Sequence, residues 1–411
     1  MSRQWKRHAG WAALILVVAG LALLAAGCGG GEEAGAPSTG TAGGEPANKD
    51  VAAGAQANVG GGEGQLDLVA WAGYVENGST DPEVDWVTPF TEKTGCKVNV
   101  TIGQDSSQMV TLMKTGNFDG VSASGDASLR LVAGDDVKPV NVALVPNYAD
   151  VIPALKDQPY NTVDGVHYGI PHGRGANILM WNKAVVKTDP DSWGVLFDPN
   201  SPYKSKISVY GFPIYIADAA VYLKATKPDL GIDNPYELDD KQFQAAVDLL
   251  KQQRQIVGEY WPDATKQIQS YEGGDSVVGT TWQYQANVIE ADEKIKVGTT
   301  LPKEGATGWS DTWMISSKAK HPNCMYMWMD WIVSPQVNAD VAEWFGEAPA
   351  NSKSCALTAS KDHCTIFHAE DEAYFDQVYE WQTPISDCGD DRGEACKDFA
   401  DWQQAWTEIK G

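Results

Sequence analysis

Strand-like and helix-like segments alternate early in this chain, and this alternation restricts its fold more than any other feature. Residues 66–71 and 97–102 have the pattern of strands, while residues 84–90 and 106–116 have the spacing of amphipathic helices. Residues 117–126 are predicted to form a short strand that opens into a polar loop. This order is typical of an open, mainly parallel α/β sheet. Ligands of such sheets bind in loops at the carboxyl ends of the strands.

The alternation returns later, which predicts a second α/β unit. Residues 206–210 and 276–282 are predicted strands, and residues 240–257 form a strongly amphipathic helix. Between the two units, glycines at 173 and 175 would let the backbone change direction. A chain of 411 residues is too long for one average domain, so two are expected.

The N-terminus carries an export signal. Basic residues precede an apolar run that ends in residues 24–28, which resemble the bacterial lipobox. Residues 1–28 are therefore interpreted as a lipoprotein signal peptide with Cys28 as the lipidation site, because the apolar run is short for the alternative, a transmembrane anchor. Residues 29–64 are rich in glycine and alanine and predict a flexible tether. We expect an exported protein that is lipid-anchored at the cell membrane, on the periplasmic side or at the cell surface.

The charge and the motifs exclude several functions. A formal net charge of −24 argues against nucleic acid and anionic membrane surfaces as partners. The sequence contains no G-x-S-x-G, P-loop or H-E-x-x-H motif, so binding is favoured over catalysis. The alternative from another class is an exported α/β hydrolase that uses His172 with an acid. No cofactor and no metal are predicted, because the spacing around Cys364 is not that of a zinc site.

Six cysteines remain besides Cys28, and an even number in an exported chain predicts disulfides. They are Cys96, Cys324, Cys355, Cys364, Cys388 and Cys396. Short spacing favours two local pairs, Cys355 with Cys364 and Cys388 with Cys396. The remaining pair would be Cys96 with Cys324, but this is one of the fifteen pairings that six cysteines allow.

Residues 305–314 combine two tryptophans and a carboxylate. On an extended segment Trp309, Asp311 and Trp313 would lie on the same side, because strand side chains have a period of two. Indole faces beside an anion suit an organic cation, through cation–π attraction and a charge-assisted hydrogen bond. The alternative is that the tryptophans are core residues and Asp311 belongs to a turn.

Several segments resemble, in their order, the solute-binding lipoproteins of ABC importers, specifically the spermidine/putrescine-binding branch. They include residues 69–75, 169–171, 279–282, 301–305, 309–311 and 346–351. The resemblance implies a two-lobed periplasmic-binding-protein fold of type II-like architecture, in which each lobe is an α/β sandwich around a mainly parallel sheet. The ligand would lie in the cleft between the lobes. Lobe 1 would comprise residues 65–172 and 304–350, and lobe 2 residues 173–303 and 351–411.

The resemblance also implies a ligand site. The residues expected to bind the ligand are Trp71, Ser124, Asp126, Trp282, Trp309, Asp311 and Glu347, with Arg174 and Tyr210 as secondary candidates. Asp126 and Glu347 stand where the family has tyrosines, and the acidic pair of the second lobe is not matched. Asp126 has helix capping as an alternative role, and Glu347 has pairing with Arg174.

By this resemblance the chain is the substrate-binding component of an ABC importer. It would capture a small amine-bearing solute, with a polyamine as first choice, and deliver it to permease subunits. A quaternary amine or an amino-acid-like zwitterion is the alternative ligand, because Arg174 is able to bind a carboxylate. The membrane would be contacted only through the lipid anchor, and a monomer is expected. An iron receptor of the same broad fold is disfavoured, because a tyrosine pair is lacking.

Overall fold

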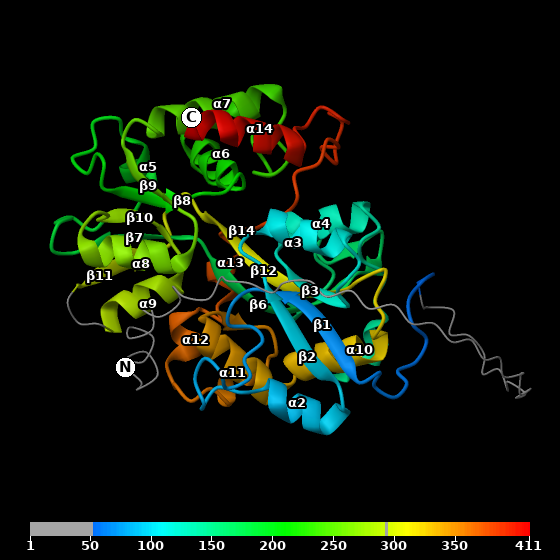
Figure 1. Cartoon of the computed structure of the whole chain (residues 1–411). Coiled ribbons are helices and arrows are strands. Elements are labelled where there is room, and N and C mark those ends of the chain that lie inside the picture. Colours follow the sequence, from blue (N-terminus) through cyan, green and yellow to red (C-terminus); the bar gives the residue numbers. More distant parts are fainter. Residues whose placement is uncertain (1–51, 292–294) are drawn as a thin grey trace, which may run out of the picture.

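The computed structural model describes residues 52–291 and 295–411. The predicted signal peptide, the lipidation site Cys28 and the first part of the predicted tether lie outside the described residues. Within the described ranges, every helix is too short or too polar to cross a bilayer. Figure 1 shows two α/β lobes, each with helices packed around its own sheet.

The described residues of lobe 1 form a seven-stranded mixed sheet with the order β13-β6-β12-β3-β1-β2, and β14 pairs with β12. Its strands are β1 (Gln65–Ala70), β2 (Lys97–Ile102), β3 (Gly120–Ala123), β6 (Gly169–Ala176), β12 (Ala306–Ile315), β13 (Ala348–Pro349) and β14 (Val378–Glu380). Its helices are α2 (Val87–Thr94), α3 (Ser106–Lys114), α4 (Gly125–Ala133), α10 (Pro322–Ile332) and α11 (Pro335–Phe345). β1 is parallel to β2 and β3, which confirms the α/β unit predicted from the first alternation.

The described residues of lobe 2 form a five-stranded sheet with the order β11-β7-β10-β8-β9. Its strands are β7 (Ile178–Asn182), β8 (Ile207–Tyr210), β9 (Val257–Trp261), β10 (Val278–Thr281) and β11 (Val297–Thr300). Its helices are α5 (Gly194–Phe197), α6 (Tyr215–Thr226), α7 (Asp240–Gln253), α8 (Ala264–Gly273), α9 (Gln283–Ala291) and α14 (Phe399–Lys410). The amphipathic helix predicted for this unit is α7, which begins at a capping box of Asp239 and Gln242 and buries Phe243 and Leu250.

The first crossing between the lobes differs from the predicted position. β6 belongs to the lobe 1 sheet and ends at Ala176, and β7 of the lobe 2 sheet begins at Ile178. The crossing is therefore at Asn177, whereas Gly173 and Gly175 lie inside β6. These glycines serve close packing, as the site below shows, and not a change of direction.

The predicted boundaries give residues 351–411 to lobe 2 alone, but this C-terminal segment is shared between the lobes. β14 pairs in parallel with the first residues of β12 in the lobe 1 sheet. By contrast, α12 (His363–Ile366) and α13 (Glu372–Phe375) adjoin a core cluster that includes residues of α8 and α9, and α14 packs against α7 (Figure 1). The segment therefore contacts both lobes.

The last part of the predicted tether is attached to lobe 1. Gln56 Nε2 and the Gly60 backbone N–H both donate to Asn323 Oδ1, at 2.6 and 2.8 Å. Glu63 accepts hydrogen bonds from the backbone N–H groups of Asn323 and Cys324 at the start of α10. The fold therefore begins before residue 64, because these polar side chains find partners on the lobe.

Disulfides join the cysteines of the described ranges in the predicted pattern. Cys355 is bonded to Cys364 and Cys388 to Cys396, which closes two short loops. Cys96 is bonded to Cys324 across 228 residues of sequence, which links the start of β2 to α10. The pairing based on spacing is confirmed.

Candidate functional site

β12 carries the centre of the site, and β6 makes room for it. Asp311 pairs with Gly173 and Trp309 with Gly175 in the antiparallel ladder between these strands. A Cβ atom at Gly173 would lie 2.1 Å from Glu347 Cδ, and one at Gly175 would lie 2.5 Å from Trp309 Cζ2. Any larger residue would therefore displace Glu347 or Trp309, which explains the two glycines.

A buried cluster of polar side chains surrounds Asp311. Ser124 Oγ donates to Asp311 Oδ1 at 2.5 Å, and Tyr74 Oη lies 2.6 Å from Asp311 Oδ2. The same Tyr74 Oη lies 3.0 Å from Glu347 Oε2. His172 Nδ1 lies 3.3 Å from Glu347 Oε1, and both side chains are fully buried. We call these five residues the Asp311 cluster.

A bulge in β6 directs His172 into this cluster. The ladder runs from the Asp311–Gly173 pair to a pair of Thr312 with Pro171, so His172 has no partner on β12. Such an extra residue bends a strand and redirects its side chain. The His172 ring consequently packs edge-on against Tyr74, with ring centroids 4.2 Å apart.

Burial governs the protonation of the acids in the cluster. Desolvation raises the pKa of Asp311 to about 6, although hydrogen bonds from Ser124 and Tyr74 oppose this shift. Desolvation also raises the pKa of Glu347, against the attraction of His172. A cation brought beside these carboxyls would favour their ionised forms.

An aromatic run leads from this cluster towards lobe 2. Phe345 packs on Tyr74 with ring centroids 4.1 Å apart, and on Trp309 at 5.7 Å. Trp309 in turn contacts Trp282 at 6.3 Å, and Trp282 contacts Trp261 at 5.2 Å. Indole faces are favourable neighbours for an organic cation or an apolar chain.

A second buried acid lies at the lobe 2 end of this run. Asp218 of α6 accepts hydrogen bonds from Tyr210 and, at 3.0 Å, from Thr307. Thr307 Oγ1 also accepts from Asn177 Nδ2 at 2.6 Å, and Trp282 Nε1 donates to Asn177 Oδ1 at 2.7 Å. Desolvation raises the pKa of Asp218 to about 7. This chain joins the crossing residue Asn177 to both β12 and α6.

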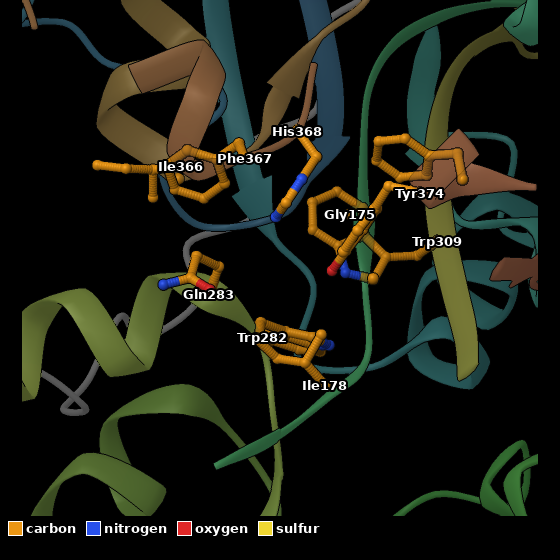
Figure 2. Close-up of a pocket in the computed structure, with 12 residues that line it drawn as sticks. Gly175, Ile178, Trp282, Gln283, Trp309, Ile366, Phe367, His368 and Tyr374 are labelled. Atoms are coloured by element: carbon orange, nitrogen blue, oxygen red, sulfur yellow. The ribbon is translucent and has the colours of Figure 1, made fainter. Parts of the chain in front are cut away.

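A narrow hollow, partly open to solvent, lies beside Trp309 and Trp282. Figure 2 shows Trp282, Trp309, Phe367 and His368 around it. Its lining residues come from both lobes and from the C-terminal segment: Gly175, Ala176, Ile178, Trp282, Gln283, Trp309, Gly346, Ile366, Phe367, His368, Tyr374 and Phe375. Trp309 Nε1 is buried and has no hydrogen-bond partner among the described residues. The hollow is therefore an aromatic pocket next to the Asp311 cluster.

The structure brings some predicted site residues together and separates others. Ser124, Asp311 and Glu347 meet in the Asp311 cluster, and Trp282 and Trp309 meet in the aromatic run. Trp71 follows β1, where it is half-buried, and its Nε1 has no partner among the described residues.

Asp126 and Arg174 have other partners. Asp126 lies in the first turn of α4 and accepts a hydrogen bond from Ser106 at 2.8 Å. Arg174 Nη2 pairs with Glu372 at 2.8 Å, and its guanidinium lies 3.6 Å from the centroid of the Phe375 ring. The alternative that Glu347 pairs with Arg174 is wrong, because neighbouring residues of β6 point to opposite faces of the sheet.

Sequence reasoning missed Tyr74, Phe345 and Asp218 as parts of the site. Tyr74 lies in the loop after β1, where no periodic pattern marks the direction of a side chain. Phe345 is the last residue of α11, directly before Gly346 and Glu347. A signal for Tyr74 was its place in a segment that resembles the family, directly after Gly73.

Residues 85–367 match the family of bacterial extracellular solute-binding proteins. The chain belongs to this family. It is 24% identical, over 68% of its length and 76% of the relative, to the putrescine-binding periplasmic protein SpuD of Pseudomonas aeruginosa. Its fold is similar to that of the spermidine/putrescine ABC transporter substrate-binding protein PotD of Streptococcus pneumoniae, with a TM-score of 0.65, 18% identity and coverage of 84% and 97% of the two chains. It is equally similar, at a TM-score of 0.65 and 17% identity, to MotA of A. tumefaciens B6 in complex with glucopine, with coverage of 84% and 100%.

Membership of the family establishes a two-lobed solute-binding transport protein that is exported. The predicted two-lobed α/β fold class is confirmed, but the sheets are mixed and not mainly parallel, because β12 is antiparallel to β3 and β6, and β7 is antiparallel to β10 and β11. The hydrolase alternative is not favoured, because the groups around His172 are Glu347, Tyr74 and Trp313, and the family serves transport.

Proposed function

We propose that this protein captures a small organic amine between its lobes and delivers it to the permease of an ABC importer, with a polyamine as the first choice. One observation carries the proposal: the carboxylate of Asp311, only 2% exposed, lies on the same strand as Trp309 at the start of an aromatic run. A buried carboxylate needs a paired cation or a proton, and an ammonium group supplies the cation. The names of SpuD and PotD, a putrescine and a spermidine/putrescine binder, agree with this ligand class.

The amine would be held by three kinds of contact. Its ammonium group would donate hydrogen bonds to Asp311, whose two carboxylate oxygens are held by Ser124 and Tyr74. Its carbon chain would lie against Trp309 and Trp282, where the narrow hollow would have to widen to admit it. Trp71 and Glu347 are proposed as further parts of the site, whereas Tyr210 is bonded to Asp218. Closure of the lobes would complete it and remove water.

A zwitterion is a weaker candidate because Arg174 is already engaged. Its guanidinium is 2% exposed, pairs with Glu372 and stacks on Phe375. A ligand carboxylate would have to displace Glu372 first. We further propose lipid anchoring at Cys28 and a monomeric protein, in keeping with an exported receptor.

Calorimetry with putrescine, spermidine, choline, betaine and amino acids tests the ligand class. Putrescine or spermidine is expected to bind tightly, and Trp309→Leu is expected to weaken binding at least about tenfold through lost cation–π and apolar contact. Trp402→Phe is the matched control. Trp402 is fully buried in α14 and packs against Phe243 of α7, so its replacement should change stability and leave affinity within about threefold. If amino acids bind while putrescine, spermidine and choline do not, the proposal is wrong.

A further inference from the structure

Tyr74 is shared between two acids but has one proton to donate. Its hydroxyl oxygen lies 2.6 Å from Asp311 Oδ2 and 3.0 Å from Glu347 Oε2. If both carboxyls were ionised, both oxygens would be acceptors, and one O–H cannot satisfy both. The shorter contact assigns the Tyr74 proton to Asp311. The contact to Glu347 is then a hydrogen bond only if Glu347 carries a proton and donates it to the Tyr74 oxygen.

His172 is the third titratable side chain in this enclosure. Its Nδ1 lies 3.3 Å from Glu347 Oε1, and its Nε2 has no hydrogen-bond partner among the described residues. The ring is enclosed by Tyr74 and Trp313, at centroid distances of 4.2 and 5.8 Å. His172 and Glu347 are both 0% exposed, so neither is able to exchange its partner for water.

Three side chains that are able to carry charge face one another here: Asp311, Glu347 and His172. Asp311 faces Ser124, Tyr74, Glu347 and His172, and Glu347 faces Tyr74, Asp311 and His172. His363 Nε2 contacts the carbonyl oxygen of Glu347 at 2.8 Å, and burial lowers the pKa of His363 to about 4, so this ring is neutral. Two carboxyls and one imidazole are electrically neutral only when they hold two protons between them. A buried net charge is costly, so this is the favoured state without a ligand.

We infer that Glu347, Tyr74 and His172 make ligand capture proton-linked: an ammonium group that binds Asp311 displaces one of the two protons held by Asp311, Glu347 and His172. In balanced form, R–NH₃⁺ and the two-proton cluster give a complex with one proton, and one H⁺ passes to solvent. The net charge of the enclosure stays at zero throughout. This inference rests on the proposed function and adds that Glu347 and His172 are positioning residues that set the charge of the ligand.

The ligand class becomes narrower in consequence. An uncharged solute would leave the two protons in place and gain no ionic bond. A primary or secondary ammonium replaces the displaced proton in charge and also donates a hydrogen bond to Asp311, whereas a quaternary amine has no N–H. The raised pKa values of Asp311 and Glu347 mean that both acids retain protons at mildly acidic pH. Affinity should therefore fall as the pH falls through about 6.

Putrescine titrations at pH 5.5, in two buffers of different ionisation enthalpy, measure the released protons. We expect close to one proton per bound putrescine at pH 5.5 and far less at pH 8, with affinity falling up to about tenfold per pH unit below 6. Tight binding with the same heat in both buffers overturns the inference but leaves the proposed function standing. Failure of every amine to bind overturns both.

Two variants separate proton linkage from a structural role. Glu347→Gln keeps the shape and a hydrogen-bond partner for Tyr74 but cannot titrate, so the proton release should fall by at least half. His172→Gln removes the attraction that lowers the pKa values of Asp311 and Glu347, so the pH profile of proton release should move to higher pH, even if the variant also has a lower melting temperature. Asp340→Asn is the matched control, because Asp340 lies on α11, is bonded to Gln336 and is outside the cluster. Unchanged proton release in both cluster variants would contradict the inference.

Discussion

Two buried acids, Asp311 in lobe 1 and Asp218 in lobe 2, have the same immediate partners but different surroundings. Each accepts one hydrogen bond from a tyrosine and one from a serine or threonine. The lobe 2 chain is complete, because Thr307 also accepts from Asn177. The lobe 1 chain is not, because Glu347 Oε1 and both ring nitrogens of His172 lack hydrogen bonds in the described part of the protein.

This difference indicates that Asp218 stabilises the fold and that Asp311 binds the ligand. Asp218 ties α6 to β12 and, through Thr307, to the crossing at Asn177. A fully satisfied network of this kind is rigid and needs nothing further. Unsatisfied buried groups are costly, and they persist where function requires them. We therefore assign ligand binding to Asp311, and the positioning of the crossing at Asn177 to Asp218.

The largest expected effect comes from neutralising each acid in turn. Asp311→Asn should weaken amine binding by about 100-fold, because a charge-assisted hydrogen bond of about 1.5–3 kcal/mol is lost. Asp218→Asn should leave affinity within about threefold but lower the free energy of unfolding by about 1–3 kcal/mol, because the amide N–H₂ would face a hydroxyl donor. Calorimetry and denaturant unfolding measure the two quantities. If Asp218→Asn costs as much affinity as Asp311→Asn, Asp218 is a second anchor and the comparison fails.

Removal of the tyrosine hydroxyls should have a smaller effect than neutralising the acids. The loss should again be one of affinity beside Asp311 and one of stability beside Asp218. Tyr74→Phe takes the donor from Asp311 and leaves Glu347 Oε2 without its neighbour, so affinity should fall about tenfold at pH 7.5. Tyr210→Phe removes a donor from Asp218, which keeps Thr307, so the expected loss is about 1 kcal/mol of stability. Equal losses of affinity in the two variants would show that the hydroxyls act only through the general packing of the cleft.

The site residues that the sequence predicted correctly lie on a strand or directly after one. Trp309 and Asp311 lie on β12, and Ser124 follows β3, where the period of two and the carboxyl end of a strand fix the position. Trp282 directly follows β10 in the same way. The disulfides were predictable because short spacing allowed two local pairs and left one.

The rest of the site depends on local irregularities that a single sequence does not reveal. His172 enters the cluster because of a bulge, and an alternating pattern does not announce where a ladder slips. Beyond this irregularity, Trp313 of β12 is a core residue packed against Trp328, which agrees with the alternative of a core tryptophan for this position. Pairing with Arg174 was an alternative role for Glu347, but the alternation of side chains along β6 places Arg174 with Glu372 instead.

The smallest effect is a dependence of stability on pH in the ligand-free protein. Burial raises the folded-state pKa of Asp311 from 3.8 to about 6 and that of Asp218 to about 7. The folded protein therefore holds these protons more tightly than the unfolded chain, so both groups reduce stability as the pH rises from about 4 to 7. The melting temperature should be higher at pH 5 than at pH 8 by about 2–4 °C for each group that titrates in this way.

Each acid should contribute in its own part of that range. Asp311→Asn should remove the part of the slope that ends near pH 6, and Asp218→Asn the part that extends to about pH 7. Added putrescine should abolish the Asp311 part alone, because the ammonium keeps that carboxylate ionised, while the Asp218 part persists. Differential scanning calorimetry of wild type and variants, with any co-purified amine removed, resolves the two parts. If putrescine abolishes the parts of the slope due to both acids, the ligand reaches Asp218 as well. The division between a structural acid, Asp218, and a ligand-binding acid, Asp311, would then be wrong.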